Sequence, residues 1–206
     1  MQIIGNVYII AAASGTGKTS LVKVLVESLN DIAISISHTT RPMRSNEREQ
    51  ESYFYISEQE FQKMIAQNEF LEYAKVFDHY YGTSKQWVEQ QIKKGNDVIL
   101  EIDWQGALQV KKYFPQSVSI FILPPSKEEL RCRLEKRNQD DKAIIAKRLA
   151  AAHEEIARCA DFDYIVINDQ FDVALVDLRS IIRSQRLQKK VQMIKYQDLL
   201  AELTKK

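Results

Sequence analysis

Short apolar runs of strand length alternate along the chain with amphipathic stretches of helical length. Each apolar run is rich in Val, Ile or Phe and is bounded by polar or turn residues, which is typical of strands buried on both faces of a sheet. These predicted strands are 6–12, 32–37, 97–102, 118–123 and 164–167. Helices are predicted at 18–29, 127–137, 142–159 and 171–187. The alternation indicates an α/β fold with a mainly parallel five-stranded core sheet and helices on both faces.

The stretch 39–83 interrupts this alternation. Its runs at 53–56 and 72–76 predict short half-buried strands around a helix near 58–67, for which Ser57 and Glu60 supply a capping box. We therefore expect an inserted α+β unit with a ligand site of its own. The segment 187–206 predicts an amphipathic helix with a basic face, which is either an interface or a tail.

Composition narrows the class of protein. The chain has 206 residues, 45% hydrophobic and 28% charged. Its longest uninterrupted apolar run, 7–13, is far shorter than the roughly 20 residues of a membrane-spanning helix, and no signal-peptide pattern opens the chain. A net charge of +1 gives no general attraction to nucleic acid or lipid. We therefore expect a cytoplasmic protein with neither partner, although arginines gather around 41–48 and 131–137, where a small polyanion could bind.

The strongest chemical signal lies directly after the first predicted strand and before a helix. It reads Ser14-Gly15-Thr16-Gly17-Lys18-Thr19. In that context the pattern is typical of a phosphate-binding loop, whose backbone N–H groups and helix N-terminus surround a triphosphate. Ala12 stands where such loops usually have their first glycine, and it is small enough to leave the loop intact. The expected roles are that Lys18 bridges the β- and γ-phosphates and that the Thr19 hydroxyl helps hold Mg²⁺.

A second anion site is indicated within the insertion. Arg41 and Arg44 flank Pro42, which keeps Arg41 out of regular helix, so both guanidinium groups could reach one dianion. The hydroxyls of Tyr53 and Tyr81 could donate to the same phosphate. A solvated basic turn beside core aromatic residues is the alternative interpretation.

With these residues the chain resembles the nucleoside monophosphate kinases, specifically the guanylate kinase family, over nearly its whole length. Besides the phosphate loop, the resemblance rests on the stretches 37–44, 68–73, 80–84, 101–106 and 167–169. It implies the P-loop kinase fold, with a core of 1–38, 84–137 and 146–206, a GMP-binding domain at 39–83 and a lid at 138–145. It also implies the reaction of ATP with GMP or dGMP to give ADP and the diphosphate, with Mg²⁺ as cofactor.

The resemblance also implies the GMP site. The residues expected to bind GMP are Ser37, Arg41, Arg44, Tyr53, Glu72, Tyr81, Gly82, Thr83, Glu101 and Asp103. The chemistry agrees, because guanine presents N1–H and a 2-amino group as donors and a carboxylate such as Glu72 can accept from both. Adenine would leave that carboxylate unpaired, at a cost of about 1 to 3 kcal/mol.

The ATP site and the catalytic cations follow from the same resemblance. The residues expected to bind ATP are Ala12, Ala13, Ser14, Gly15, Thr16, Gly17, Lys18, Thr19, Ser20, Arg133, Arg137 and Asn168. The cations expected at the transferring phosphoryl group are Lys18, Arg41, Arg44, Arg137 and Arg148. Thr19 is the expected Mg²⁺ ligand, with Asp103 and Glu101 acting through water. The oligomeric state stays open between monomer and homodimer.

Two alternatives come from other classes of protein. Scaffold domains similar to guanylate kinase bind phosphopeptides but have degraded phosphate loops, whereas Lys18 and Thr19 are present here. A kinase of the same fold with a sugar-phosphate acceptor would have no use for Glu72 and Thr83 as readers of a base.

Overall fold

The structure is a computed structural model of the chain, and it describes residues 5–45, 47–76, 78–136 and 142–205. The larger of its sheets has five parallel strands in the order β2-β7-β1-β8-β9. These strands are β1 (Val7–Ala12), β2 (Ile32–Ile34), β7 (Asp97–Glu101), β8 (Val118–Leu123) and β9 (Tyr164–Ile167). The predicted fold class is confirmed.

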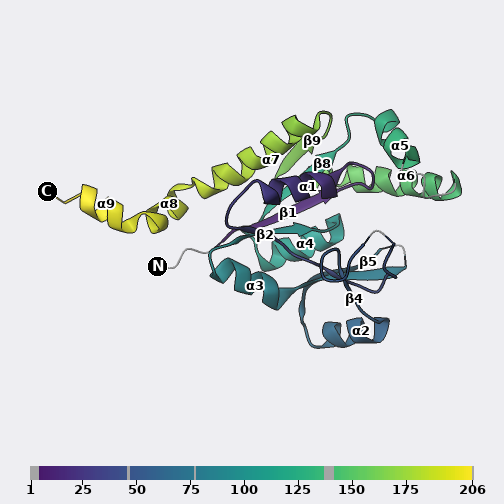
Figure 1. Cartoon of the computed structure of the whole chain (residues 1–206), viewed down its shortest axis with the longest axis horizontal. Coiled ribbons are helices and arrows are strands. Elements are labelled where there is room, and N and C mark those ends of the chain that lie inside the picture. Colours follow the sequence, from purple (N-terminus) through teal and green to yellow (C-terminus); the bar gives the residue numbers. More distant parts are fainter. Residues whose placement is uncertain (1–4, 46, 77, 137–141, 206) are drawn as a thin grey trace.

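Alternate residues of the central strands face opposite layers of helices, as the two-residue period of a strand requires. Tyr8 and Ile10 of β1 pack with α1 (Lys18–Glu27) and α7 (Phe171–Arg186). Val7 and Ile9 pack on the other face with α3 (Lys85–Lys93) and α4 (Trp104–Tyr113). Both layers are seen in Figure 1, with the sheet between them. This arrangement makes β1 a buried support for the loop that follows it.

The other sheet has the strand order β4-β3-β6-β5. It comprises β3 (His38–Thr39), β4 (Phe54–Tyr55), β5 (Phe70–Val76) and β6 (His79–Ser84). The predicted capping box opens α2 (Glu58–Ala66), since Ser57 Oγ accepts from the backbone N–H of Glu60 at 3.1 Å. Strand β5 packs on α4, which fixes this sheet against the larger one.

The remaining helices follow β8 and α7. They are α5 (Lys127–Lys136), α6 (Lys142–Ala157), a 3₁₀ turn at Cys159–Asp161, α8 (Lys189–Lys195) and α9 (Gln197–Leu203). Helices α8 and α9 continue from α7 away from the rest of the molecule and carry the C-terminus to one extreme of the long axis (Figure 1). None of the described helices has the length and apolar character needed to cross a bilayer.

Several predicted boundaries were wrong. Strand β2 ends at Ile34 rather than 37, because the chain leaves the sheet after the Ser35 N–H bonds to Ile99 and then enters the smaller sheet at His38. The single helix predicted over 187–206 is two helices, because Tyr196 has φ −115° and ψ 29°, outside the helical region. Helices α3 and α4 and strands β3 and β6 were not predicted.

Candidate functional site

The loop between β1 and α1 has the backbone of an anion cradle. Gly15 and Gly17 have φ values of +92° and +89°, a region that favours glycine. Each also lacks room for a side chain. A Cβ on Gly15 would lie 2.9 Å from Leu134 Cδ2, and one on Gly17 would lie 2.7 Å from Asn168 Nδ2. The two glycines therefore let N–H groups turn inward while α5 and the end of β9 close on the loop from outside.

Two predicted ATP ligands hold this loop directly. Asn168 Nδ2 donates to the Thr16 carbonyl at 2.6 Å, and Arg133 Nη1 donates to the same oxygen at 3.3 Å. Arg133 also donates to the Asn168 carbonyl at 3.1 Å and to Glu129 at 2.7 Å. The Thr16 hydroxyl is buried without a hydrogen-bond partner among the described residues, so a polar acceptor at the loop would satisfy it.

The first turn of α1 meets a carboxylate at the end of β7. Thr19 Oγ1 donates to Glu101 Oε2 at 3.1 Å, and Lys18 Nζ lies 3.8 Å from the same oxygen. Of the neighbouring positions predicted to bind ATP, Ala13 is buried and Ser20 is exposed. Glu101 therefore lies against the phosphate loop. The sequence predicted two roles for it, in binding GMP and in holding metal-bound water.

Glu155 belongs to the same cluster and was missed. Its Oε2 accepts from the Ser14 N–H at 3.3 Å, and burial raises the pKa of its carboxyl above the ordinary value. It lies on α6, two helical turns after the predicted cation Arg148, which is half-buried. That spacing of seven residues, which places both on one face of the helix, is the signal that could have found it.

The second half of the candidate site is a buried carboxylate on the smaller sheet. Glu72 is 4% exposed and pairs across β5 and β6 with Thr83, whose hydroxyl donates to Glu72 Oε1 at 2.5 Å. Burial raises the pKa of Glu72 to about 7, the charge of Asp103 adds to this, and the bonds from Thr83 oppose it. Gly106 makes room for the carboxylate, since a Cβ there would lie 2.5 Å from Glu72 Oε2.

The predicted arginine turn is organised by a residue that sequence reasoning did not single out. Glu47 accepts from Arg41 Nη2 at 2.6 Å, from the Arg44 N–H at 2.9 Å and from the Tyr55 hydroxyl at 2.8 Å. Burial alone would raise the pKa of Glu47, but these hydrogen bonds outweigh it and hold the pKa at about 2. The Arg41 guanidinium lies 5.5 Å from the centre of the Tyr53 ring. An acidic side chain thus already occupies the donors of this turn, as an anion would.

The other residues predicted to bind GMP are placed as follows. Tyr53 and Tyr81 are half-buried, with ring centres 5.8 Å apart in an edge-to-face arrangement. Gly82 is buried with its α-carbon facing Phe61 and Phe70, and Ser37 accepts from the Phe54 N–H through its carbonyl. The Arg44 side chain is exposed. Arg137 and residues 138–141 of the predicted lid lie outside the described residues.

One short segment joins the two halves. Glu101 contacts the phosphate loop, and two residues later Asp103 begins α4 by accepting from the Gly106 N–H at 2.8 Å. Gly106 in turn faces Glu72. Residues 101–106, which run from the end of β7 into the first turn of α4, therefore fix the anion cradle and the buried carboxylate relative to each other. The acidic residues predicted at 101 and 103 both lie in this connection.

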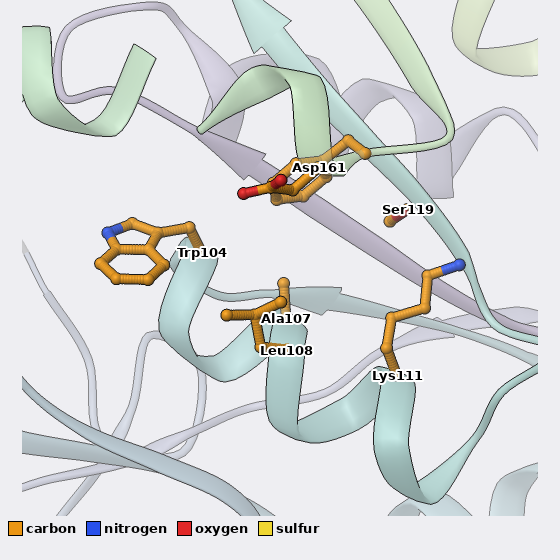
Figure 2. A pocket seen from close by; sticks show the side chains of 7 residues that line it. Trp104, Ala107, Leu108, Lys111, Ser119 and Asp161 are labelled. Carbon is orange, nitrogen blue, oxygen red and sulfur yellow. The ribbon is translucent and has the colours of Figure 1, made fainter. Parts of the chain in front are cut away.

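A narrow pocket between α4 and the turn at Cys159–Asp161 contains none of the predicted site residues. Figure 2 shows its lining, with Trp104 at the start of α4, Lys111 near the end of that helix, and Asp161 on the turn. The Lys111 ammonium is held by Asp163 at 2.5 Å and by the Ser117 carbonyl at 2.6 Å. Arg158 lies 4.5 Å above the Trp104 ring. The Lys111 contacts hold α4 to the residues just before β8 and β9, and the Arg158 contact holds it to the start of the turn.

Comparisons with known proteins agree with this geometry. The family model described as guanylate kinase matches residues 4–185. The chain belongs to the guanylate kinase family. It is 56% identical to the guanylate kinase of Coxiella burnetii, over 98% of both chains, and 49% identical to that of Vibrio cholerae, over 97% of both. A crystal structure of guanylate kinase from Anaplasma phagocytophilum superposes with a TM-score of 0.77 at 30% identity, covering 91% of this chain and 89% of the other.

Membership of the guanylate kinase family confirms the resemblance and the enzyme class. The chain is a nucleoside monophosphate kinase, and its fold is that of a solved guanylate kinase. The alternatives of a phosphopeptide scaffold and of a sugar-phosphate kinase are set aside, because guanylate kinases at about half identity match almost the whole length.

Proposed function

We propose that the chain transfers the γ-phosphoryl group of ATP to GMP or dGMP, reversibly, giving ADP and the nucleoside diphosphate. The observation that carries this proposal is the connection at 101–106, which holds a phosphate loop at one end and a buried carboxylate with a neighbouring donor-rich turn at the other. The phosphate loop suits a nucleoside triphosphate, and the buried carboxylate with the donor-rich turn suits a guanine nucleotide.

On the ATP side, residues 12–20 hold the phosphates. The inward N–H groups and the α1 N-terminus bind the β-phosphate, and Lys18 reaches the β- and γ-phosphates. Arg133 and Asn168 support this cradle through the Thr16 carbonyl and border the adenine. Arg148 on α6 and Arg137 add positive charge at the transferring group.

On the GMP side, Glu72 reads the base. As a carboxylate it accepts from both N1–H and the 2-amino group of guanine, and Thr83 fixes its orientation. Ser37 and Asp103 complete the edge of the base pocket. Because Glu72 is buried, a base without those donors leaves a desolvated carboxylate unpaired, which disfavours adenine.

The GMP phosphate is bound by the turn around Arg41. Arg41, Arg44, Tyr53 and Tyr81 supply the donors, and the neighbouring Gly82 packs closely against Phe61 and Phe70. A phosphate oxygen of GMP attacks the γ-phosphorus as the bond to the β–γ bridging oxygen breaks. This oxygen needs no general base, because the second pKa of a phosphate monoester is about 6 and the group is already ionised. The protein's contribution is alignment and the cancellation of charge by Lys18 and the arginines.

Magnesium fits the donor set beside the loop. Thr19 and Glu101 offer oxygen atoms, and the described residues hold no cluster of three or more His, Cys, Asp or Glu side chains that could bind a metal without the nucleotide. With ATP bound, Mg²⁺ would neutralise phosphate charge while Thr19 holds it, with Glu101 and Asp103 acting through water.

The same proposal divides the chain into a core of 1–38, 84–137 and 146–206, a GMP-binding domain at 39–83 and a lid at 138–145. We also propose that the reaction takes place in the cytoplasm.

Lys18→Ala tests the proposal most simply. The wild-type protein should form ADP and GDP from ATP and GMP, and the variant should lose turnover by at least about a thousandfold because charge stabilisation at the γ-phosphate is gone. Calorimetry should show GMP binding to the variant within about twofold of wild type, since the two nucleotides use different halves. Loss of GMP binding would contradict the division, and absence of wild-type turnover would contradict the function.

A further inference from the structure

Helix α6 carries a row of three residues along one of its faces. Arg148, Ala152 and Glu155 follow one another at intervals of four and three residues, which places them on the same side of the helix. Ala152 is buried, and Glu155 Oε2 accepts from the Ser14 N–H of the phosphate loop. Arg148 is the member of the row that is proposed to add positive charge at the transferring phosphoryl group. The row therefore links a proposed catalytic cation to a contact with the phosphate loop.

Apolar contacts hold the second half of α6 against the body of the protein. Ala152 packs in a buried cluster with Ala13, next to the phosphate loop, and with Leu130 and Leu134 of α5. Helices α5 and α6 lie side by side at the end of the molecule opposite to the C-terminus (Figure 1). Burial of apolar surface is non-directional, so these contacts keep α6 close to the loop but do not by themselves fix its orientation.

The hydrogen bond between Ser14 and Glu155 is a directional contact between the loop and α6. It is 3.3 Å long, and its strength depends on both distance and angle. Burial raises the pKa of the Glu155 carboxyl, the bond from Ser14 lowers it, the charge of Asp103 raises it further and Lys18 opposes that. The carboxyl group is therefore within electrostatic range of the starts of α1 and α4 as well as in contact with the loop.

The distance from Glu155 to Arg148 along the helix makes this contact important for the reaction. Seven residues of α-helix span about 10 Å, so a tilt of α6 by about 6° at Glu155 would move Arg148 by about 1 Å. A displacement of about 1 Å can cost about a hundredfold in rate. We propose that Glu155 is a positioning residue, which orients α6 by holding the Ser14 N–H and thereby places Arg148 at the transferring phosphoryl group. This inference rests on the proposed phosphoryl transfer from ATP to GMP.

A double-mutant cycle in the full-length protein is the kinetic test. Glu155→Ala should lower kcat by about tenfold or more. Glu155→Gln keeps an acceptor oxygen at the same reach and should hold kcat within about threefold of wild type. In a protein that already carries Arg148→Ala, the further change Glu155→Ala should lower kcat by less than about twofold, since the cation that Glu155 positions is gone.

Two controls separate positioning from general damage. Glu154→Ala changes an exposed neighbour on the same helix and should keep the wild-type kcat. The KM for GMP in Glu155→Ala should stay within about twofold of wild type, because GMP uses the other half of the site. GMP binding at wild-type affinity, measured by calorimetry, would also show that Glu155→Ala folds.

Hydrogen exchange of the Ser14 amide measures the contact without any turnover. Nuclear magnetic resonance of the nucleotide-free protein should show faster exchange in Glu155→Ala than in wild type, with Glu155→Gln close to wild type. Equal exchange in all three proteins would overturn the proposal. A loss of kcat that Glu155→Gln does not recover, or one that persists in the Arg148→Ala background, would overturn it too. Absence of wild-type turnover would instead contradict the proposed function, and the exchange rates would still decide whether Glu155 holds the loop.

Discussion

The hydroxyl of Thr83 donates a 2.5 Å hydrogen bond to the buried carboxylate of Glu72, directly across two antiparallel strands. Cross-strand pairing fixes both residues in the sheet, and Gly106 of α4 closes over the other carboxylate oxygen. Since the carboxylate has lost water and gained one neutral donor, burial leaves its pKa raised to about 7. A ligand that donates further hydrogen bonds to the Glu72 carboxylate would therefore stabilise its ionised form.

The first prediction concerns the pH dependence of GMP binding. Only ionised Glu72 can accept from both guanine donors, so the KM for GMP should rise by about tenfold per pH unit below pH 7. Glu72→Gln should weaken GMP binding by about 10- to 100-fold at pH 8 and should narrow the preference over AMP by a similar factor. The KM for ATP should not change.

Steady-state kinetics of both proteins from pH 5.5 to 8.5 provide the check. The phosphate of GMP also titrates, near pH 6, but it does so equally for both proteins, so the ratio of their KM values isolates Glu72. If the ratio of the two KM values for GMP did not change with pH, Glu72 would not be the residue that accepts from guanine.

The second prediction concerns stability without ligand. Glu72 has a pKa of about 7 when folded and 4.5 when unfolded. Between these values the unfolded chain has released its proton and the folded chain retains it, so the free energy of unfolding should fall as pH rises through this window. The full loss is about 3 kcal/mol. Urea unfolding at pH 4.5 and pH 8 should show a loss that is larger in wild type than in Glu72→Gln by about this amount, because other groups such as Glu155 titrate in both proteins.

Glu69→Gln is the control for that measurement, because Glu69 is exposed and should leave the pH dependence as in wild type. An equal pH dependence in all three proteins would contradict the burial argument.

The third prediction concerns the glycine that makes room for Glu72. Replacing glycine by alanine inside a helix ordinarily stabilises it by up to about 1 kcal/mol. Gly106→Ala should instead weaken GMP binding by about tenfold or more, because its Cβ would lie 2.5 Å from Glu72 Oε2 and would displace the carboxylate. Calorimetry with GMP measures the loss, with the exposed Lys112→Ala on the same helix as control. Undiminished GMP affinity in Gly106→Ala would show that Glu72 can move freely.

The fourth prediction separates the two halves of the site at Glu101. Because Glu101 contacts Thr19 and Lys18, Glu101→Ala should lower kcat by at least about tenfold and raise the Mg²⁺ concentration needed for half-maximal rate. GMP affinity should stay within about twofold of wild type. Magnesium titrations and GMP calorimetry test this, with the exposed Glu135→Ala as control. Lost GMP affinity would instead favour the role in GMP binding expected from sequence.

Features whose residues are contiguous in the sequence could be predicted, whereas contacts between distant residues could not. The phosphate loop and the core strands could be found because their residues are contiguous and the order of strand, loop and helix is diagnostic. Ser84 and Asp103, which cap α3 and α4, were not recognised as helix starts, although Asp103 was singled out for the site. Asp103 is both a helix cap and a predicted site residue. Its carboxylate was interpreted only as a site residue, so the start of α4 was not predicted.

The contacts that organise the site are less local. Glu155 lies 141 residues from Ser14, so only the folded chain brings the two together. Glu47 is six residues from Arg41, but the turn between them follows no regular period from which a contact could be predicted. The break between α8 and α9 at Tyr196 was not predicted either, because the spacing of the apolar residues on both sides of it is that of a helix.

The proposed site binds ATP in one half and recognises the guanine of the acceptor nucleotide in the other. The most direct measurement is a coupled assay of the purified protein with ATP, Mg²⁺ and, in separate reactions, GMP, dGMP, AMP, CMP, UMP and ribose bisphosphate. We expect rapid ADP formation with GMP, turnover with dGMP, and rates with the other acceptors at least about a hundredfold lower. Equal turnover with AMP and GMP, or none with GMP, would contradict the proposed function.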